Sequence, residues 1–201
     1  MADGRTIHIK RTDFAGQAAT RVFNDEKLGV EVFQRSGTAG EVCEIAFSGM
    51  RCKPDYQYRF RSQEAAQAHR ETWYQAKRAG AEEKRNRVEL SRAAGAQLGV
   101  GDVLVAIWGY EQTNYNYYQV TRKVGALSVE IRELAKDVSY NDAAMVGECV
   151  PIKGRFIGAP MIKRVDSQGG VKVSCARATK KSSMVVGGVD VFSPDRYTSY
   201  A

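Results

Sequence analysis

Residues 102–134 read DVLVAIWGYEQTNYNYYQVTRKVGALSVEIREL, and the fold follows from this stretch. Residues 103–108 are apolar on both faces of an extended chain, which predicts a central strand. YYQVTRKV and LSVEIREL place apolar side chains at every second position with Gly125-Ala126 between them, so two further strands and a tight turn are expected. Consecutive short strands of this kind predict a small antiparallel β-barrel, SH3-like or similar, or a sandwich.

The sequence before this stretch adds short strands and one long helix. Ile7 and Ile9, and then Val30 and Val32, alternate with polar residues in the manner of half-buried strands. Ser62 is a favourable N-cap for the Ala-, Glu-, Lys- and Arg-rich run that follows. We therefore expect an α+β chain forming one compact unit. Its segments are an N-terminal β segment (1–61), a helix (62–95), a small β-barrel domain (96–181) and a C-terminal strand and tail (182–201).

The predicted helix has a thin apolar stripe centred on Trp73. We expect its first half to pack through Trp73 and its second half to be solvated, with a kink or break allowed at Gly80. Its charges are typical of a solvated face, and recruitment of a partner helix is the alternative. Tyr56, Tyr58 and Phe60 precede it and form either a platform for single-stranded nucleic acid or, more simply, a surface buried under the helix.

All of the excess positive charge lies in one C-terminal segment. The chain carries +7, and residues 151–181 alone contain eight basic residues against one acidic residue, again +7. Such a focused patch indicates an anionic partner, and the alternative is that it only keeps the domain soluble. MIKRV, DSQGG and VKVSCARA predict a hairpin here, with Val171, Val173 and Cys175 facing inward. The candidate anion-binding residues are Lys163, Arg164, Lys172, Arg177, Lys180 and Lys181.

The aromatic stretch WGYEQTNYNYYQV, residues 108–120, is interpreted as a strand end, a loop and a strand start, with Trp108 and Tyr118 on strand positions that suit the core. If its tyrosines are exposed beside the basic hairpin, they would stack on bases while the cations neutralise phosphates. The alternative is that the rings pack over the end of the barrel and the asparagines shape a turn. The candidate residues of this aromatic loop are Tyr110, Asn114, Tyr115 and Tyr117.

The segments flanking the basic hairpin are expected to be less regular. Residues 136–160 carry several glycines and prolines and are predicted to lack regular structure. The tail is expected to add one short strand around Val189 and Val191.

The catalytic motifs that we sought are missing from the sequence. It has no phosphate loop, no GxSxG and no HExxH, and His69 on the helix is the one candidate base. Cys149 and Cys175 would be nucleophiles only if nearby cations activated them. The four cysteines form no CxxC, so we expect reduced, partly buried thiols, no metal site and no cofactor. A non-catalytic protein is favoured over an enzyme of unknown type.

The sequence also bears on compartment and assembly. It has no apolar run of transmembrane length, and MADGRTIHIK lacks the apolar region of a signal peptide. We therefore expect a cytoplasmic protein without a membrane partner. Exposed strand edges in a small barrel also allow a homodimer.

Three stretches together resemble a known group of proteins. KPDYQYRFRS, GVGDVLVAIWGYEQTNYNYYQV and VPIKGRFIGAPMIKRV…VKVSCARA are similar, in that order, to uncharacterised small proteins encoded by bacteriophages and plasmids. The resemblance covers roughly Lys53 to Ala178, and VGD…WGYEQTN…YYQV is its most specific block. It implies an accessory protein of a mobile element in a bacterial host, and it supplies no catalytic residue. The first fifty residues and the tail after Lys180 do not fit the pattern.

Two function classes remain in view. The first is a non-catalytic protein that binds nucleic acid or a nucleotide through the basic hairpin and the aromatic loop. The second is an inhibitor that docks on a host protein, for example an enzyme of antiviral defence, through the long helix and the loop. A variant of the second sequesters a small anionic signalling nucleotide, which would need a closed pocket.

Overall fold

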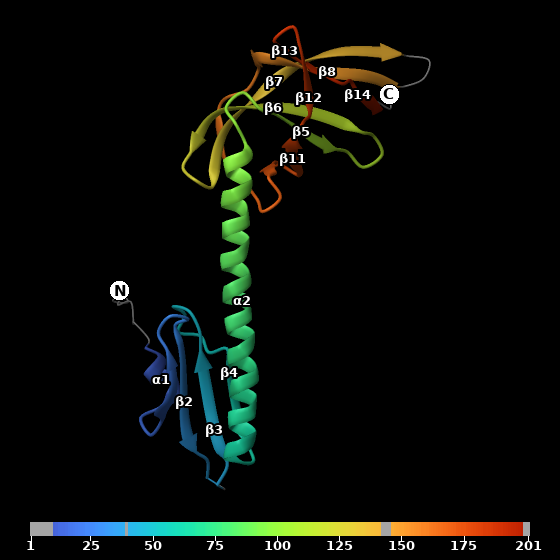
Figure 1. The fold of residues 1–201 in the computed structure, drawn as a ribbon. Helices are drawn as coiled ribbons and strands as arrows, with labels where there is room; N and C mark the ends of the chain where they lie inside the picture. Colours follow the sequence, from blue (N-terminus) through green and yellow to red (C-terminus); the bar gives the residue numbers. More distant parts are fainter. Residues whose placement is uncertain (1–9, 39, 142–145, 199–201) are drawn as a thin grey trace, which may run out of the picture. The chain divides into compact units, whose positions relative to one another are not determined.

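The computed structural model of the chain describes residues 10–38, 40–141 and 146–198 (Figure 1). The chain forms two compact units, Met1–Lys84 and Arg85–Ala201, and their boundary falls inside the long helix α2 (Gln63–Gln97). Each unit is considered by itself. The strand expected around Ile7 and Ile9 lies outside the described residues.

The first unit is a four-stranded antiparallel meander with helical residues on both faces of the sheet. The short helix α1 (Arg11–Ala15) places Ala15 against a cluster that includes Phe47. On the opposite face, Trp73 of α2 packs against a cluster that includes Tyr56. The strands follow one another in the sheet in the order β1 (Thr20–Asp25), β2 (Val30–Ser36), β3 (Val42–Phe47) and β4 (Tyr56–Phe60).

Helix α2 begins where the sequence predicts. The Ala65 N–H donates to Ser62 Oγ at 3.2 Å, which satisfies one of the free amides of the first turn. Trp73 packs on the sheet and residues 82–87 are exposed, as expected. The end of the helix differs from the prediction of a solvated second half, because Ser91 is buried and Ala94 packs against the core of the second unit. The helix continues through Gly80 without a break. Tyr56 is buried beneath it, whereas Tyr58 is half exposed.

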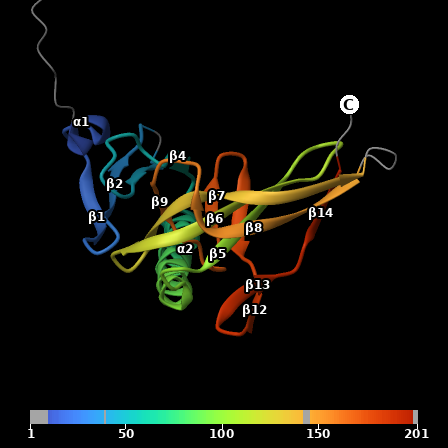
Figure 2. The ribbon, with the colours of Figure 1, turned by 90° about the horizontal axis from the view of Figure 1, so that it is seen from above.

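The second unit is built on an eight-stranded antiparallel sheet. Its path runs β10-β11-β5-β6-β7-β8-β14, and β9 pairs with the first part of β7. Figure 2 shows β5 to β8 side by side. A separate hairpin, β12 with β13, follows β11 in sequence. The strands of this unit are β5 (Val103–Trp108), β6 (Asn114–Val124), β7 (Ser128–Asn141), β8 (Val146–Phe156), β9 (Met161–Arg164), β10 (Val171–Val173), β11 (Ala176–Lys180), β12 (Ser183–Val186), β13 (Val189–Phe192) and β14 (Asp195–Thr198).

The expectation of α+β structure holds, but the closed barrel is wrong, because the sheets are open. Strand β7 pairs with β6 and β9 near its beginning, then shifts register between Leu134 and Lys136 and pairs with β8. This irregularity separates the part of β7 that pairs with β6 and β9 from the part that pairs with β8. A single isolated bridge, Val165 to Val171, links the segments around β9 and β10, and one bridge does not close a sheet. The arrangement is closer to the sandwich alternative.

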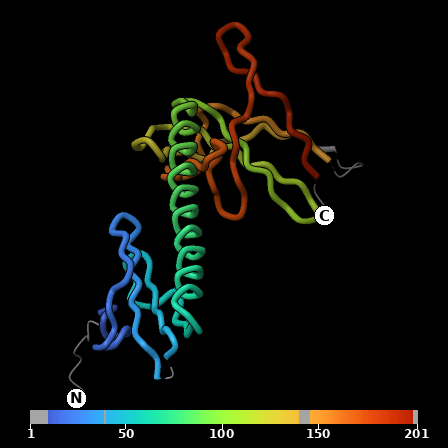
Figure 3. Tube along the Cα trace, turned by 60° about the horizontal axis from the view of Figure 1, so that its bottom comes forward, coloured from blue at the N-terminus to red at the C-terminus, as the bar shows by residue number. Residues whose placement is uncertain are grey.

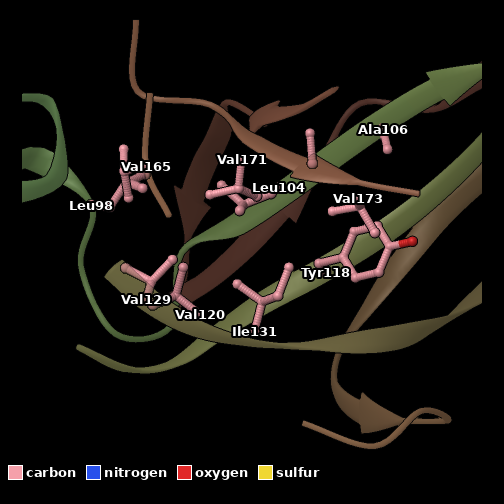
Figure 4. Close-up of a cluster of buried hydrophobic side chains, with 11 residues drawn as sticks. Leu98, Leu104, Ala106, Tyr118, Val120, Val129, Ile131, Val165, Val171 and Val173 are labelled. Atoms are coloured by element: carbon pink, nitrogen blue, oxygen red, sulfur yellow. The ribbon is translucent and has the colours of Figure 1, made fainter. Parts of the chain in front are cut away.

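The two faces of this sheet bury different clusters. One face gathers the hydrophobic residues drawn in Figure 4, including Leu104, Ile131 and Tyr118, and Ala94 near the end of α2 packs against them. The other face buries a cluster around Tyr117 and Cys149. Because β6 supplies residues to both clusters, its alternating sequence determines what each face contains.

Residues 136–160 differ from the prediction, because most of them belong to β7 and β8. Glycine suits Gly147 in β8, since a Cβ there would lie 2.4 Å from the Ser139 carbonyl oxygen and 2.4 Å from the Tyr197 ring. Pro151 pairs with Lys136 beside the register shift, where a missing N–H is tolerated.

The run VKVSCARA also differs from the prediction of one strand. It forms β10 and β11, joined by a two-residue turn in which Ser174 has φ 53°. A turn with positive φ reverses the chain at this point. Cys175 is therefore exposed at the turn, whereas Val171 and Val173 are buried as expected.

Candidate nucleic-acid interface

Two of the candidate cations lie on the surface of the second unit and are paired with carboxylates. Arg177 donates to Asp166 through Nε at 2.6 Å and through Nη2 at 2.9 Å. Hydrogen bonding from the Arg177 side chain is the main reason that the pKa of Asp166 falls to about 2. Lys180 Nζ lies 2.7 Å from Asp102 Oδ2. Both pairs are exposed enough to exchange a carboxylate for phosphate, because surface ion pairs contribute only about 0–1 kcal/mol.

A third candidate, Lys181, lies inside the unit. Its side chain is 7% exposed, its Nζ is 2.7 Å from Asp195 Oδ2, and it sits over the Tyr117 ring at 5.9 Å. A lysine held in this way cannot leave its carboxylate without burying an uncompensated charge. Lys181 is therefore a structural cation and is removed from the candidate phosphate contacts.

The remaining three candidates are Lys163, Arg164 and Lys172. Within residues 10–38, 40–141 and 146–198, no carboxylate lies within ion-pair distance of them. Arg164 and Lys172 are exposed, and Lys163 is half-buried. Lys172 is paired in register with Arg177, so the two side chains emerge from the same face of the β10–β11 hairpin. This is the exposed positive surface that the structure offers.

The aromatic stretch is distributed differently from the prediction. The loop between β5 and β6 is residues 109–113, so Asn114 and Tyr115 belong to β6. Tyr110 is 99% exposed, as a stacking residue requires, but Tyr117 has no exposed surface. Trp108, expected in the core, is 43% exposed at the end of β5.

The loop depends on a glycine. Gly109 has φ 128°, and a Cβ on it would lie 1.8 Å from the carbonyl oxygen of Gln112. Only a residue without a side chain fits such a close approach at positive φ. The turn therefore projects Tyr110 outward directly beside Trp108.

Two adjoining hollows lie between this loop and the β10–β11 turn. The outer hollow is lined by Trp108, by residues 109–112, which include the acidic Glu111, and by Cys175. The inner one continues past Trp108 and Cys175 toward Asn116 of β6, above buried residues of the first cluster. The structure thus brings the aromatic loop to the β10–β11 turn. The hairpin predicted from MIKRV and VKVSCARA is wrong, because β9 pairs with β7 and a single isolated bridge, Val165 to Val171, links it to β10.

The Trp108 ring is held in place by an amide and a carboxylate. Its Nε1 donates to Asn116 Oδ1 at 2.6 Å, and Asn116 Nδ2 donates to Glu133 Oε1 at 2.6 Å. Asn116, which holds the ring, faces Ala106 of β5, and Glu133, which holds Asn116, faces Tyr118 of β6. A ring fixed in this way loses little freedom when a flat ligand stacks on it. Sequence reasoning missed Glu133, since only the register of β6 with β7 shows it.

On the opposite face of β6, Tyr117 forms a buried polar cluster. Its hydroxyl donates to Asp195 Oδ2 at 2.5 Å and lies 3.1 Å from the Cys149 carbonyl oxygen. Burial, followed by the bond to Asp195, raises the pKa of Tyr117. Burial and the charges of Asp195 and Cys149 also raise the pKa of Tyr115, which packs against this cluster. Asp195, from the tail, carried no sequence signal.

The residues considered as catalytic candidates are not brought together. Cys149 is 1% exposed inside the buried cluster, and Cys175 lies at the exposed β10–β11 turn. His69 belongs to the first unit, where its ring contacts Tyr56, Tyr58 and Phe60. In the part of the chain that the structure describes, no three His, Cys, Asp or Glu side chains are grouped as metal ligands.

No known protein serves as a guide to the role of this site. The chain matches no protein-family model, no curated protein and no solved structure. Among the described residues, no helix is both long and apolar enough to cross a membrane.

Proposed function

We propose that this chain is a non-catalytic protein that binds single-stranded nucleic acid at the hollow between the 109–113 loop and the β10–β11 turn. Trp108 and Tyr110 stack on bases, and Lys172 contacts a backbone phosphate. Lys163 and Arg164 pair with the beginning of β7, away from the hollow, and contact phosphates further along a longer strand. The observation that carries the proposal is that two exposed aromatic rings line the same hollow as the β10–β11 turn. One of them, Trp108, is fixed by its hydrogen bond to Asn116.

An extended strand fits this site better than a small free nucleotide. A sequestered nucleotide needs an enclosed pocket, and Tyr110, on the outer hollow, is almost fully exposed. Lys172 lies two residues before the turn at Ser174, or about 7 Å along the strand. Its side chain points to the face of the β10–β11 hairpin opposite Val173, which lines the inner hollow, so a strand stacked on Trp108 must pass around the turn to bring a phosphate to Lys172.

The chain has two tryptophans, Trp73 and Trp108, which makes a direct test possible. In a Trp73→Phe background, stacking on Trp108 is expected to quench its fluorescence when a short single-stranded DNA is added. Anisotropy of the same DNA, labelled with fluorescein, gives the affinity across a salt series. Tyr110→Ala is expected to weaken binding about 5- to 160-fold, because stacking contributes about 1–3 kcal/mol per base.

The charge contribution is measured with a matched pair of variants. Lys172→Gln is expected to reduce the slope of log affinity against log salt by about 0.7, the value for one phosphate contact with a single strand. Lys84→Gln, on the solvated part of α2, is the control and leaves the slope unchanged. Absence of binding at moderate salt, or equal binding by Tyr110→Ala, refutes the proposed function.

A second candidate, docking on a host protein, is favoured by one observation. The β12–β13 hairpin exposes Met184, Val186, Val189 and Val191, which share one face by register. Contiguous exposed aliphatic side chains are typical of interaction surfaces. A host protein that is captured after nuclease treatment by the unsubstituted chain, and not by a Val186→Asp, Val189→Asp variant, would support this candidate. Equal capture by both would remove it.

A further inference from the structure

The loop that carries Tyr110 is tied to the C-terminal strand β14. Its last residue, Thr113, exchanges two hydrogen bonds with Thr198. The Thr113 N–H donates to Thr198 Oγ1 at 2.8 Å, and the Thr198 N–H donates to the Thr113 carbonyl oxygen at 3.2 Å. Figures 1 and 3 both show this green loop beside the C-terminal end of the chain.

Strand β14 is itself held by the buried polar cluster. It is four residues long and pairs along one side with β8, from Asp195 opposite Cys149 to Thr198 opposite Val146. Such a short strand needs further contacts to stay in place. Asp195 supplies them, because its Oδ2 accepts from Tyr117 Oη at 2.5 Å and from Lys181 Nζ at 2.7 Å.

These contacts align β14 with the beginning of β6. Asp195 contacts Tyr117, and Thr198 contacts Thr113, so the two segments run in opposite directions. Thr113, just before β6, and Tyr117, within it, are four residues apart, or about 13 Å along an extended chain. Strand β14 thus links the interior of the sheet, where Lys181 neutralises the Asp195 carboxylate, to the base of the exposed 109–113 loop.

We infer that β14 positions the aromatic loop for its ligand, with Thr198 as the positioning residue and Asp195 as the group that locks β14 to the sheet. The inference rests on the proposed function, since it concerns the same site. Thr198 touches no ligand. It acts by fixing the backbone from which Tyr110 projects, so that less freedom is lost when a base stacks there.

The test compares Thr198→Val with Thr198→Ser in the full-length chain carrying Trp73→Phe. Valine keeps the branched shape and removes the Oγ1 acceptor, whereas serine retains the acceptor. Hydrogen exchange of the free protein reports whether the Thr113 amide is held. Quenching of Trp108 by a short single-stranded DNA reports the affinity. Asp195→Asn, which weakens the anchor while retaining the shape, is the second variant.

We expect Thr198→Val to speed exchange of the Thr113 amide, to leave β7 and β8 protected, and to weaken DNA binding about 2- to 10-fold, as loss of one hydrogen bond predicts. Thr198→Ser should match the unsubstituted chain. Asp195→Asn should speed exchange along β14 as well as at Thr113.

Several outcomes would overturn the inference, and they differ from failure of the proposed function. Unchanged exchange in Thr198→Val would show that Thr198 does not hold the loop. Faster exchange with undiminished affinity would show that holding the loop does not matter for binding. If the unsubstituted chain binds no DNA, the proposed function fails, while the exchange of Thr113 still decides whether β14 holds this loop.

Discussion

Tyr117→Phe isolates the contribution of one hydroxyl group to the second unit. Tyr117 is fully buried, and phenylalanine keeps its ring, so the substitution leaves the apolar packing almost unchanged. What is lost is a 2.5 Å hydrogen bond to Asp195, whose carboxylate then retains Lys181 as its partner. Hydrogen bonds to charged groups contribute about 1.5–3 kcal/mol, so we expect the free energy of unfolding of this unit to fall by about 2 kcal/mol.

The measurement must report on the second unit alone. In a Trp73→Phe background, the fluorescence of Trp108 follows its unfolding in urea. Tyr110→Phe removes the same hydroxyl from a fully exposed ring and serves as the matched control, with a change within about 0.5 kcal/mol. If Tyr117→Phe also stays within that limit, the hydroxyl is not a stabilising donor, and the reasoning about the buried cluster is refuted.

The remaining predictions concern a turn and two ion pairs. Gly109→Ala places a Cβ against the Gln112 carbonyl oxygen at a φ of 128°. It should destabilise the second unit by about 2 kcal/mol or more and abolish DNA binding. Unchanged urea unfolding and unchanged binding would contradict this. The pKa of Asp166 is lowered to about 2 by Arg177, so its stabilisation is present above the unfolded value of 3.8 and is lost as pH falls toward 2. Arg177→Gln should flatten the dependence of the unfolding free energy on pH in this range. A profile identical to that of the unsubstituted chain would show that the Asp166–Arg177 pair does not stabilise the second unit. Arg70→Met leaves Glu44 buried without its 2.8 Å partner and should lower the stability of the first unit by about 3 kcal/mol; a thermal unfolding midpoint equal to that of the unsubstituted chain would disprove it.

Much of the secondary structure could be predicted, because it depends on local periodicity. The apolar run 103–108 and the alternation over 117–124 predict strands, and Ser62 marks the start of α2. Residues 114–116, predicted as loop, belong to β6. The pairing of distant strands could not be predicted in the same way. Whether the sheet closes depends on the register shift beside Lys136 and on the single bridge at Val165, and neither has a periodic signal.

The candidate site was predictable in its chemistry and less so in its members. The aromatic rings lie beside the turn between β10 and β11, a two-residue reversal at Ser174 inside a run that looks like one strand. Lys172 of the same hairpin points to the face opposite Val173 and the hollow. The burial of Lys181 depends on Asp195, which lies fourteen positions further along the chain. A long-range ion pair of this kind changes a candidate ligand into a structural residue, and composition does not show it.

The aromatic stretch itself follows a simple rule once the faces of β6 are assigned. Asn116 and Tyr118 point to the face where Trp108 and the hollow lie, whereas Tyr115 and Tyr117 point to the face where β14 is anchored. The amides and tyrosines are therefore not one surface, because alternate residues of a strand face opposite ways. A substitution on one face of β6 can therefore alter the contacts that residues on its other face make. Binding at the loop and stability of the buried cluster should accordingly vary together in variants of β6, and independently in variants of the β10–β11 surface.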